Sequence, residues 1–214
     1  MAYRTSAGVA FYVSQTFAAT KAVSAVTNAN PAVATSTAHG YSNGAELLFV
    51  SGWERASNTV FRAANVSTNA LDLSGLNSTN TNLFASGAGT GTLSLISNWI
   101  EIPQVLTIST SGGDARNITV NPLKLVQGIL LPNGFNPATI TLGIGSDESL
   151  ANWATLLDIS RSNTLVAFKA VKGSGAASYG YGYFQMSEVD QQGADQVDTV
   201  NAQFLAQGRV IKYA

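Results

Sequence analysis

The sequence predicts a mainly β protein with a single helix, and three observations support this class. Short runs of alternating apolar and polar residues recur between residues 21 and 96, separated by turn residues. Longer runs of the same kind continue toward the C-terminus, and only one segment has apolar residues at helical spacing. Strands this short, at intervals of roughly ten residues, are typical of small all-β barrels and sandwiches.

The N-terminal residues 7–13 predict the first strand, because they form a short apolar run. Ser14, Gln15 and Thr16 interrupt that run, which favours an ordered strand over a secretory signal peptide. A compact module is then predicted over residues 21–95, inserted between the first strand and the rest of the chain. Its predicted strands are residues 22–27, 32–37, 46–52, 59–65, 70–73 and 92–96.

The stretch from Trp99 to Gly145 organises the second half of the chain. It contains two predicted strands, 105–110 and 139–144, and the Gly112-Gly113 pair permits a turn that other residues resist. Residues 121–137 predict a long amphipathic connection, and such loops are usually functional. Its apolar residues are expected either to meet a partner or to fold back onto the chain's own core. The candidate residues are Leu123, Lys124, Leu125, Val126, Ile129, Leu130 and Leu131.

Residues 147–160 predict the only helix, because their apolar residues fall on one stripe at helical spacing. Ser146 or Asp147 is expected to cap the N-terminus, and Arg161 to Asn163 to end the helix. This amphipathic helix is expected to lie against a sheet. The stripe consists of Leu150, Trp153, Ala154, Leu156, Leu157 and Ile159.

The last part of the chain predicts four more strands and one acidic connection. Alternating tyrosines at positions 179, 181 and 183 are expected to line one face of a strand. The acidic set Glu188, Asp190, Asp195 and Asp198 follows, and we expect no basic residue to balance it. The predicted strands are residues 164–171, 178–187, 196–207 and 210–213.

Composition narrows the function classes. Charged residues make up 11% of the chain and the net charge is −1, against about 25% charged residues in ordinary domains. Such a surface has no attraction for nucleic acid or anionic membranes and is weakly protected against association. The chain has no cysteine, which excludes disulfides and thiolate metal sites. No apolar run approaches the ~20 residues of a membrane span, so no membrane partner is expected.

No catalytic, cofactor or metal site is predicted, and an enzyme is not expected. His39, the single histidine, lies in a glycine-containing turn and is expected to bond backbone groups there. Gly87, Gly89 and Gly91 lack the lysine of a phosphate loop, which favours a turn.

Two sets of residues carry a resemblance to known families. The turn TAHGYSNG at 37–44 and the later VFRAANVSTNALDL resemble a small β-barrel insert of phage structural proteins and ubiquitin-activating enzymes. The segments VLTISTSGGD, LPNGF, DESLANWATLL and LAQGRVIKY resemble the major tail tube protein of long-tailed (siphovirus-type) bacteriophages. The resemblance covers nearly the whole chain and departs between Arg116 and Gln127, where the family is usually acidic.

The tail tube resemblance implies a fold of two packed antiparallel sheets, a β-sandwich, with one flanking helix. The sandwich is expected over residues 1–20 and 96–214, with the inserted small β-barrel over 21–95. It further implies a structural virion protein assembled in the host cytoplasm, whose hexameric rings stack into the tail tube through which DNA passes. The implied partners are copies of the chain, the tape measure, tail terminator and tail tip proteins, and DNA in transient non-specific passage.

Three functional questions stay open at this stage. The acidic set is either a repulsive lining of the DNA channel or an ordinary solvated turn. The alternative to a tail tube protein is a secreted or surface β-sandwich that binds carbohydrate through stacking on the face of Tyr179, Tyr181 and Tyr183. A third hypothesis is the tube component of a contractile injection machine, which shares the sheet architecture.

Overall fold

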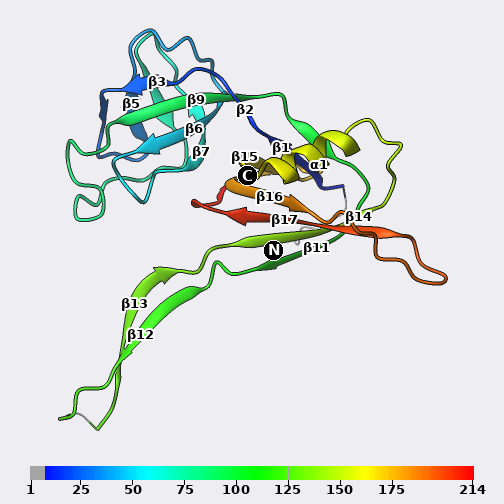
Figure 1. Ribbon diagram of the computed structural model, residues 1–214. Helices are drawn as coiled ribbons and strands as arrows, with labels where there is room; N and C mark the ends of the chain where they lie inside the picture. The colour runs from blue at the N-terminus through cyan, green and yellow to red at the C-terminus, as the bar shows by residue number, and fades with distance from the viewer. Residues whose placement is uncertain (1–7, 125) are drawn as a thin grey trace.

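The computed structural model describes residues 8–124 and 126–214. In this part of the chain two antiparallel eight-stranded sheets, a two-stranded ladder and one helix are present (Figure 1). The mainly β prediction with two antiparallel sheets and one helix is confirmed. Of the predicted first strand, Ala7 lies outside the described residues, and the strand itself begins at Ala10.

The main sheet comes from the first strand and from the chain after residue 99. Its order is β10-β1-β15-β16-β17-β14-β11, with β18 paired to β16. The sheet bends around its own core, where the ring of Phe168 stacks on that of Phe204 with centroids 4.7 Å apart. Its strands are β1 Ala10–Ser14, β10 Ile100–Ile102, β11 Val105–Ser111, β14 Thr139–Gly145, β15 Leu165–Val171, β16 Ala177–Met186, β17 Thr199–Ala206 and β18 Ile211–Tyr213.

The helix α1, Trp153–Ser162, buries Trp153, Leu156 and Ile159 in this core. Ser160 anchors it to β16, because its hydroxyl accepts a hydrogen bond from the Met186 amide at 2.8 Å. The prediction that the helix starts at residue 147 is wrong. Asp147 instead closes a turn by accepting the backbone N–H and the hydroxyl of Ser149 at 3.0 and 2.5 Å. The predicted end is confirmed, since Asn163 takes a left-handed conformation there.

The inserted sheet contains the six predicted short strands. Its order is β2-β9-β6-β7-β8-β5-β4, with β3 also paired to β9. Ser24 separates β3 from β4, and its N–H bonds to the Thr35 carbonyl. The strand pairings do not form a closed barrel, so the small β-barrel expected over residues 21–95 is not confirmed. The strands are β2 Thr16–Phe17, β3 Lys21–Val23, β4 Ala25–Val26, β5 Ala32–Thr35, β6 Glu46–Ser51, β7 Thr59–Ala64, β8 Ala70–Leu73 and β9 Gly91–Ser97.

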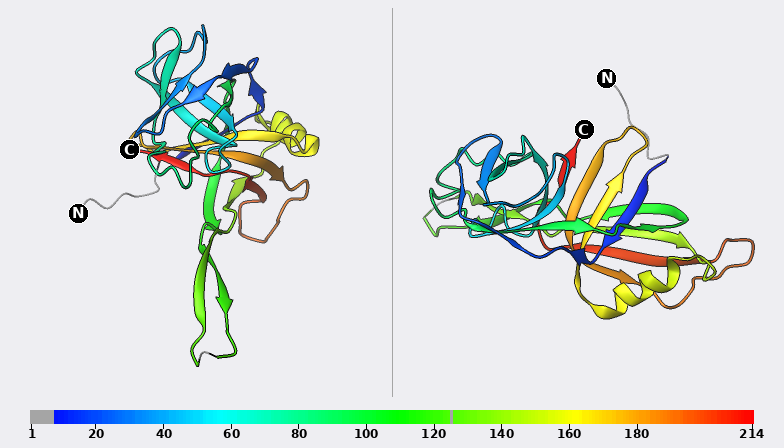
Figure 2. Two further views of the ribbon diagram at one scale, coloured as in Figure 1. Left: turned by 90° about the vertical axis from the view of Figure 1, so that its left-hand side faces the viewer. Right: turned by 90° about the horizontal axis from the view of Figure 1, so that it is seen from above.

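A two-stranded ladder projects from the edge of the main sheet (Figure 2). Strands β12 Ala115–Val120 and β13 Ile129–Phe135 form it, and we call residues 112–138 the arm. Hydrogen bonds between Gly113 and Asn136 and between Asn136 and Asp114 join it to the β11–β14 pair. The expected long loop at 121–137 is therefore wrong in form, because its second half is a strand paired with a segment before it.

The bend between the main sheet and the arm depends on Gly112. Its φ is +74°, and a Cβ atom there would collide with the carbonyl oxygen of Pro137. The next residue, Gly113, has φ +75° but open space around it. Both positions carry the cost of a left-handed conformation for any other residue, whereas only Gly112 adds a steric clash.

We expect Gly112→Ala to destabilise the β11–β14 junction by about 2–3 kcal/mol and Gly113→Ala by about 1–2 kcal/mol. Hydrogen exchange of the amides in β11 and β14 measures the local free energy of opening for both variants. Equal losses at the two positions would show that the close approach of Pro137 plays no part in the bend.

Candidate interaction surfaces

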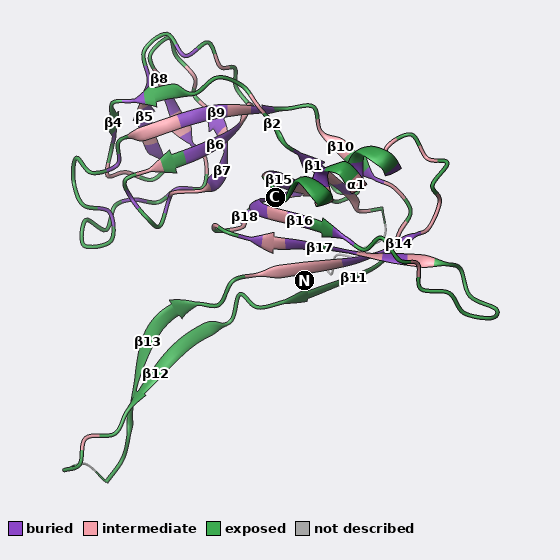
Figure 3. Ribbon diagram, in the orientation of Figure 1, coloured by how far each residue is buried: buried purple, intermediate pink, exposed green. Residues whose placement is uncertain are grey.

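The arm exposes apolar side chains that the rest of the molecule leaves uncovered. Every described residue of β12 and β13 is exposed (Figure 3). Ile118 pairs with Leu131 and Val120 with Ile129 across the ladder. Directly paired residues point to the same side of a ladder, so these four side chains form one apolar face. Leu123 and Val126 add two fully exposed apolar side chains at the tip.

The residues predicted for this surface fall on the arm as a group. The possibility that the segment folds back onto the chain's own core is wrong, because its apolar side chains are exposed. Leu125 lies outside the described residues. The predicted residues found exposed are Leu123, Lys124, Val126, Ile129, Leu130 and Leu131.

Sequence reasoning missed three apolar residues of the arm. Ile118 and Val120 lie on β12, and Phe135 lies at the end of β13 with 72% of its surface exposed. The signal for the first two was present, because Ile118 and Val120 alternate with polar residues at the period of a strand.

The acidic set lies in the connection between β16 and β17 and is partly balanced. Arg161 on α1 donates to the Glu188 carboxylate at 2.7 Å, so the expectation that no basic residue balances this set is wrong. The carboxylate raises the pKa of Arg161. The pair was not predicted because Arg161 and Glu188 are 27 positions apart in the sequence. They meet because the C-terminal part of α1 lies beside the C-terminal end of β16. A channel-lining role for Glu188, Asp190, Asp195 and Asp198 stays a prediction.

The tyrosine face of β16 packs against the inserted sheet and not against solvent. Tyr179 and Tyr181 are buried, in contact with a cluster that includes Leu48, Val60 and Ile96. Only Tyr183 is half-buried. Sugar stacking requires exposed rings, so the carbohydrate hypothesis loses the surface on which it rested.

A polar contact fixes the two sheets together beside these tyrosines. The Lys169 ammonium lies 3.3 Å from both carboxylate oxygens of Glu46, and Tyr179 donates its hydroxyl to the same carboxylate at 2.6 Å. The ammonium also sits 4.4 Å from the centre of the Trp99 ring. Glu46 belongs to the inserted sheet and Lys169 to the main sheet, so this contact holds one against the other.

Burial raises the pKa of four tyrosines above the ordinary value of 10.0, and the Glu46 carboxylate adds to the effect at Tyr179. The unfolded chain then loses phenol protons at lower pH than the native protein. The stability that these four tyrosines contribute is therefore fully present below pH 10 and is lost as the pH rises above it. The four residues are Tyr41, Tyr179, Tyr181 and Tyr213.

Ultraviolet titration of the phenolate band checks this prediction. At a pH of about 10.5 the native protein is expected to contain fewer phenolates than the protein in denaturant. A parallel series of denaturant melts is expected to give a falling free energy of unfolding above pH 10. Identical titration curves for the native and unfolded chains would contradict it.

The remaining predicted sites have structural explanations. His39 is buried, and its Nδ1 accepts the backbone N–H of Tyr41 at 3.0 Å while the two rings stack, as expected for a turn residue. Gly87 lies in a turn with a φ of +78°. Within the described ranges no three histidine or carboxylate side chains gather to hold a metal ion. No helix among the same residues is long and apolar enough to cross a membrane.

Comparison with known proteins identifies a family that the chain matches. A family model described as "Phage tail tube protein, TTP" matches residues 51–214. The matched part contains the arm, α1, every strand of the main sheet except β1, and strands β7, β8 and β9 of the inserted sheet. None of the curated proteins compared with the chain matches it.

Proposed function

The chain belongs to the phage tail tube protein family, and on this premise we propose that its copies close into hexameric rings that stack into a DNA-conducting tube. As a member of that family it is a structural protein of the virion tail.

The exposed apolar arm is the observation that carries this proposal. It presents the four-residue face of Ile118, Val120, Ile129 and Leu131 and an apolar tip to water. Burying each such side chain contributes about 1.5–3 kcal/mol. A monomer gains nothing from this exposure, whereas a neighbouring copy that covers the arm recovers it. We therefore assign the arm to contacts between subunits of one ring or of adjacent rings.

The free edges of the main sheet support ring closure. Within the described residues β10 pairs only with β1, and β11 only with β14. Strand β11 carries no charged residue, the usual protection of an exposed edge. Pairing between edges of neighbouring subunits removes this liability, and a head-to-tail contact makes a ring when its rotation closes.

DNA passage fits the low charge of the chain. A strongly basic channel would bind phosphates and hold the DNA in place. The net charge of −1 gives the subunit no overall attraction for DNA. No step of this function requires catalysis or a cofactor, so we propose that the chain acts by assembly alone.

Sedimentation velocity over a concentration series tests the self-association. We expect a boundary of large species to grow as the protein concentration rises, together with a fixed small oligomer corresponding to the ring. A single monomer boundary at every concentration would contradict the proposal.

A further inference from the structure

A large basic groove lies between the inserted sheet, the base of the arm and one end of the main sheet. Its volume is about 1510 Å³, and four basic residues line it: Arg55, Lys172, Arg209 and Lys212. Glu54 is the only acidic residue among the lining residues. The groove therefore has a net charge of +3, in a chain whose net charge is −1.

The charges of the groove have no partners within the described residues. All four basic side chains are exposed, and the ion pairs present there involve only Arg161 and Lys169. Exposed apolar side chains form another part of the lining, among them Leu106 and Ile108 from β11. A ligand that fits this surface combines negative charge with apolar groups.

The connection between β16 and β17, residues 187–198, combines these two properties, and we call it the acidic loop. Asp190, Asp195 and Asp198 form no ion pair in the described structure. Val189 and Val197 are exposed beside them, at 75% and 69% of their surface.

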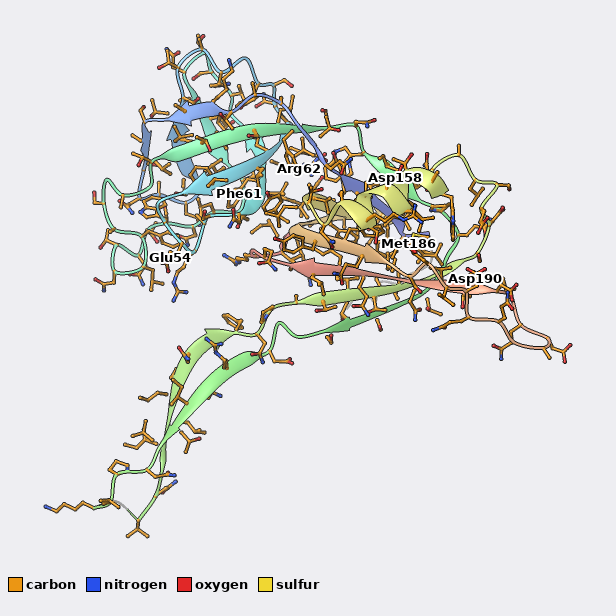
Figure 4. All side chains as sticks on the ribbon, in the orientation of Figure 1. Glu54, Phe61, Arg62, Asp158, Met186 and Asp190 are labelled. Atoms are coloured by element: carbon orange, nitrogen blue, oxygen red, sulfur yellow. The ribbon has the colours of Figure 1, made fainter. Side chains whose placement is uncertain are left out.

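On the main sheet, Lys172 and Lys212 of the groove lie at the opposite end from the acidic loop. Lys172 immediately precedes the turn that leads into β16, whereas the acidic loop follows the other end of the same strand. Glu54 at the groove and Asp190 in the loop accordingly lie at opposite sides of the molecule (Figure 4). The loop of a subunit therefore does not reach the basic side chains of its own groove, and it projects from the body of the molecule (Figure 1).

We propose that the acidic loop of one copy docks in the basic groove of a second copy. This inference rests on the proposed self-assembly and names a contact that carries it. It also gives the acidic loop a role between subunits in place of the channel lining expected from the sequence. Because the two surfaces lie at opposite ends, the contact is head-to-tail and passes from copy to copy.

Charge reversal with trans-complementation tests this contact. A loop variant combines Asp190→Lys and Asp198→Lys with Asp195→Asn, because Asn tolerates the left-handed conformation of Asp195, and its loop has a net charge of about +1. A groove variant combines Lys172→Glu with Arg209→Glu, which changes the net charge of the groove from +3 to about −1. Each variant alone places like charges in contact, so we expect the concentration required for assembly to rise more than about tenfold. In an equimolar mixture the basic loop meets the acidic groove and the acidic loop meets the basic groove, so assembly is expected to return.

A matched control changes charge elsewhere. Lys21→Glu on β3 alters an exposed side chain outside both surfaces, and we expect this variant to assemble as the wild type does. Circular dichroism of all variants checks that each subunit is folded before assembly is measured.

The outcomes separate this proposal from the proposed function. Normal assembly of either variant alone, or failure of the mixture to recover, overturns the docking while wild-type assembly leaves the tube function standing. Wild-type protein that stays monomeric overturns the function and the contact with it. If the groove variant assembles normally but loses binding to a DNA duplex in fluorescence anisotropy, the groove is a phosphate-binding surface and the docking is overturned.

Discussion

Replacing Leu123 and Val126 together by Asp is expected to abolish self-association while leaving the isolated subunit folded. Both side chains are fully exposed at the tip of the arm, and surface substitutions of this kind usually change stability by less than about 0.5 kcal/mol. In an assembled tube the same positions are covered, and two carboxylates buried there without partners cost several kcal/mol. The concentration required for assembly should therefore rise more than about a hundredfold.

Light scattering of the double variant, beside the wild type, measures this effect. Val50→Asp is the matched control, because Val50 is 43% exposed on β6 and lies outside the arm. We expect this control to assemble normally. Assembly of the arm variant at the wild-type concentration would show that the tip stays in water in the tube, and the proposed role of the arm would fail.

Replacing Glu46 by Ala is expected to lower the free energy of unfolding by about 2–3 kcal/mol. The side chains of Lys169 and Glu46 are only 16% and 18% exposed, so the substitution leaves a largely buried ammonium without its counter-charge. The Tyr179 hydroxyl loses its acceptor at the same time. Urea denaturation measures the loss, and limited proteolysis of the inserted sheet reports whether it is released from the main sheet.

Glu46→Gln is the control that separates charge from hydrogen bonding. Its amide oxygen can still accept the Tyr179 hydroxyl, while the attraction for Lys169 disappears. We expect a smaller loss than for the alanine variant. A loss below about 0.5 kcal/mol in both variants would mean that apolar packing alone, through residues such as Val60 and Tyr181, holds the two sheets together.

The short strands of the inserted sheet were predictable because local signals agree there. Turn residues such as Asn43 and Gly44 separate runs of alternating apolar residues, and Gly44 has the expected positive φ of +84°. Each run buries one face against the same core, so local pattern and tertiary packing favour the same structure. The long strands β15 and β16 were predictable for the same reason.

The start of the helix could not be predicted, because two local structures compete for the same residues. An Asp followed by Glu suits a helix N-terminus, but Asp147 also bonds to Ser149 two residues on, which stabilises a turn. Tertiary packing decides between them. Trp153 enters the core directly after this turn, and the helix starts there without a side-chain cap.

The strand pairing of the arm and the ion pairs between distant segments could not be predicted from a single sequence. The apolar character of residues 123–131 indicated a surface for a partner, but nothing local indicated that Ile118 pairs with Leu131 across a ladder. Contacts between distant segments were hidden for the same reason. The pairs Arg161–Glu188 and Lys169–Glu46 depend on sheet topology, which sequence spacing does not contain.

Electron microscopy of the concentrated wild-type protein tests the central claim most directly, that the subunit covers its arm and sheet edges with further copies of itself. The account predicts hollow tubes of stacked rings, with sixfold symmetry in end views. The account would be contradicted by micrographs that show only dispersed single subunits at high protein concentration.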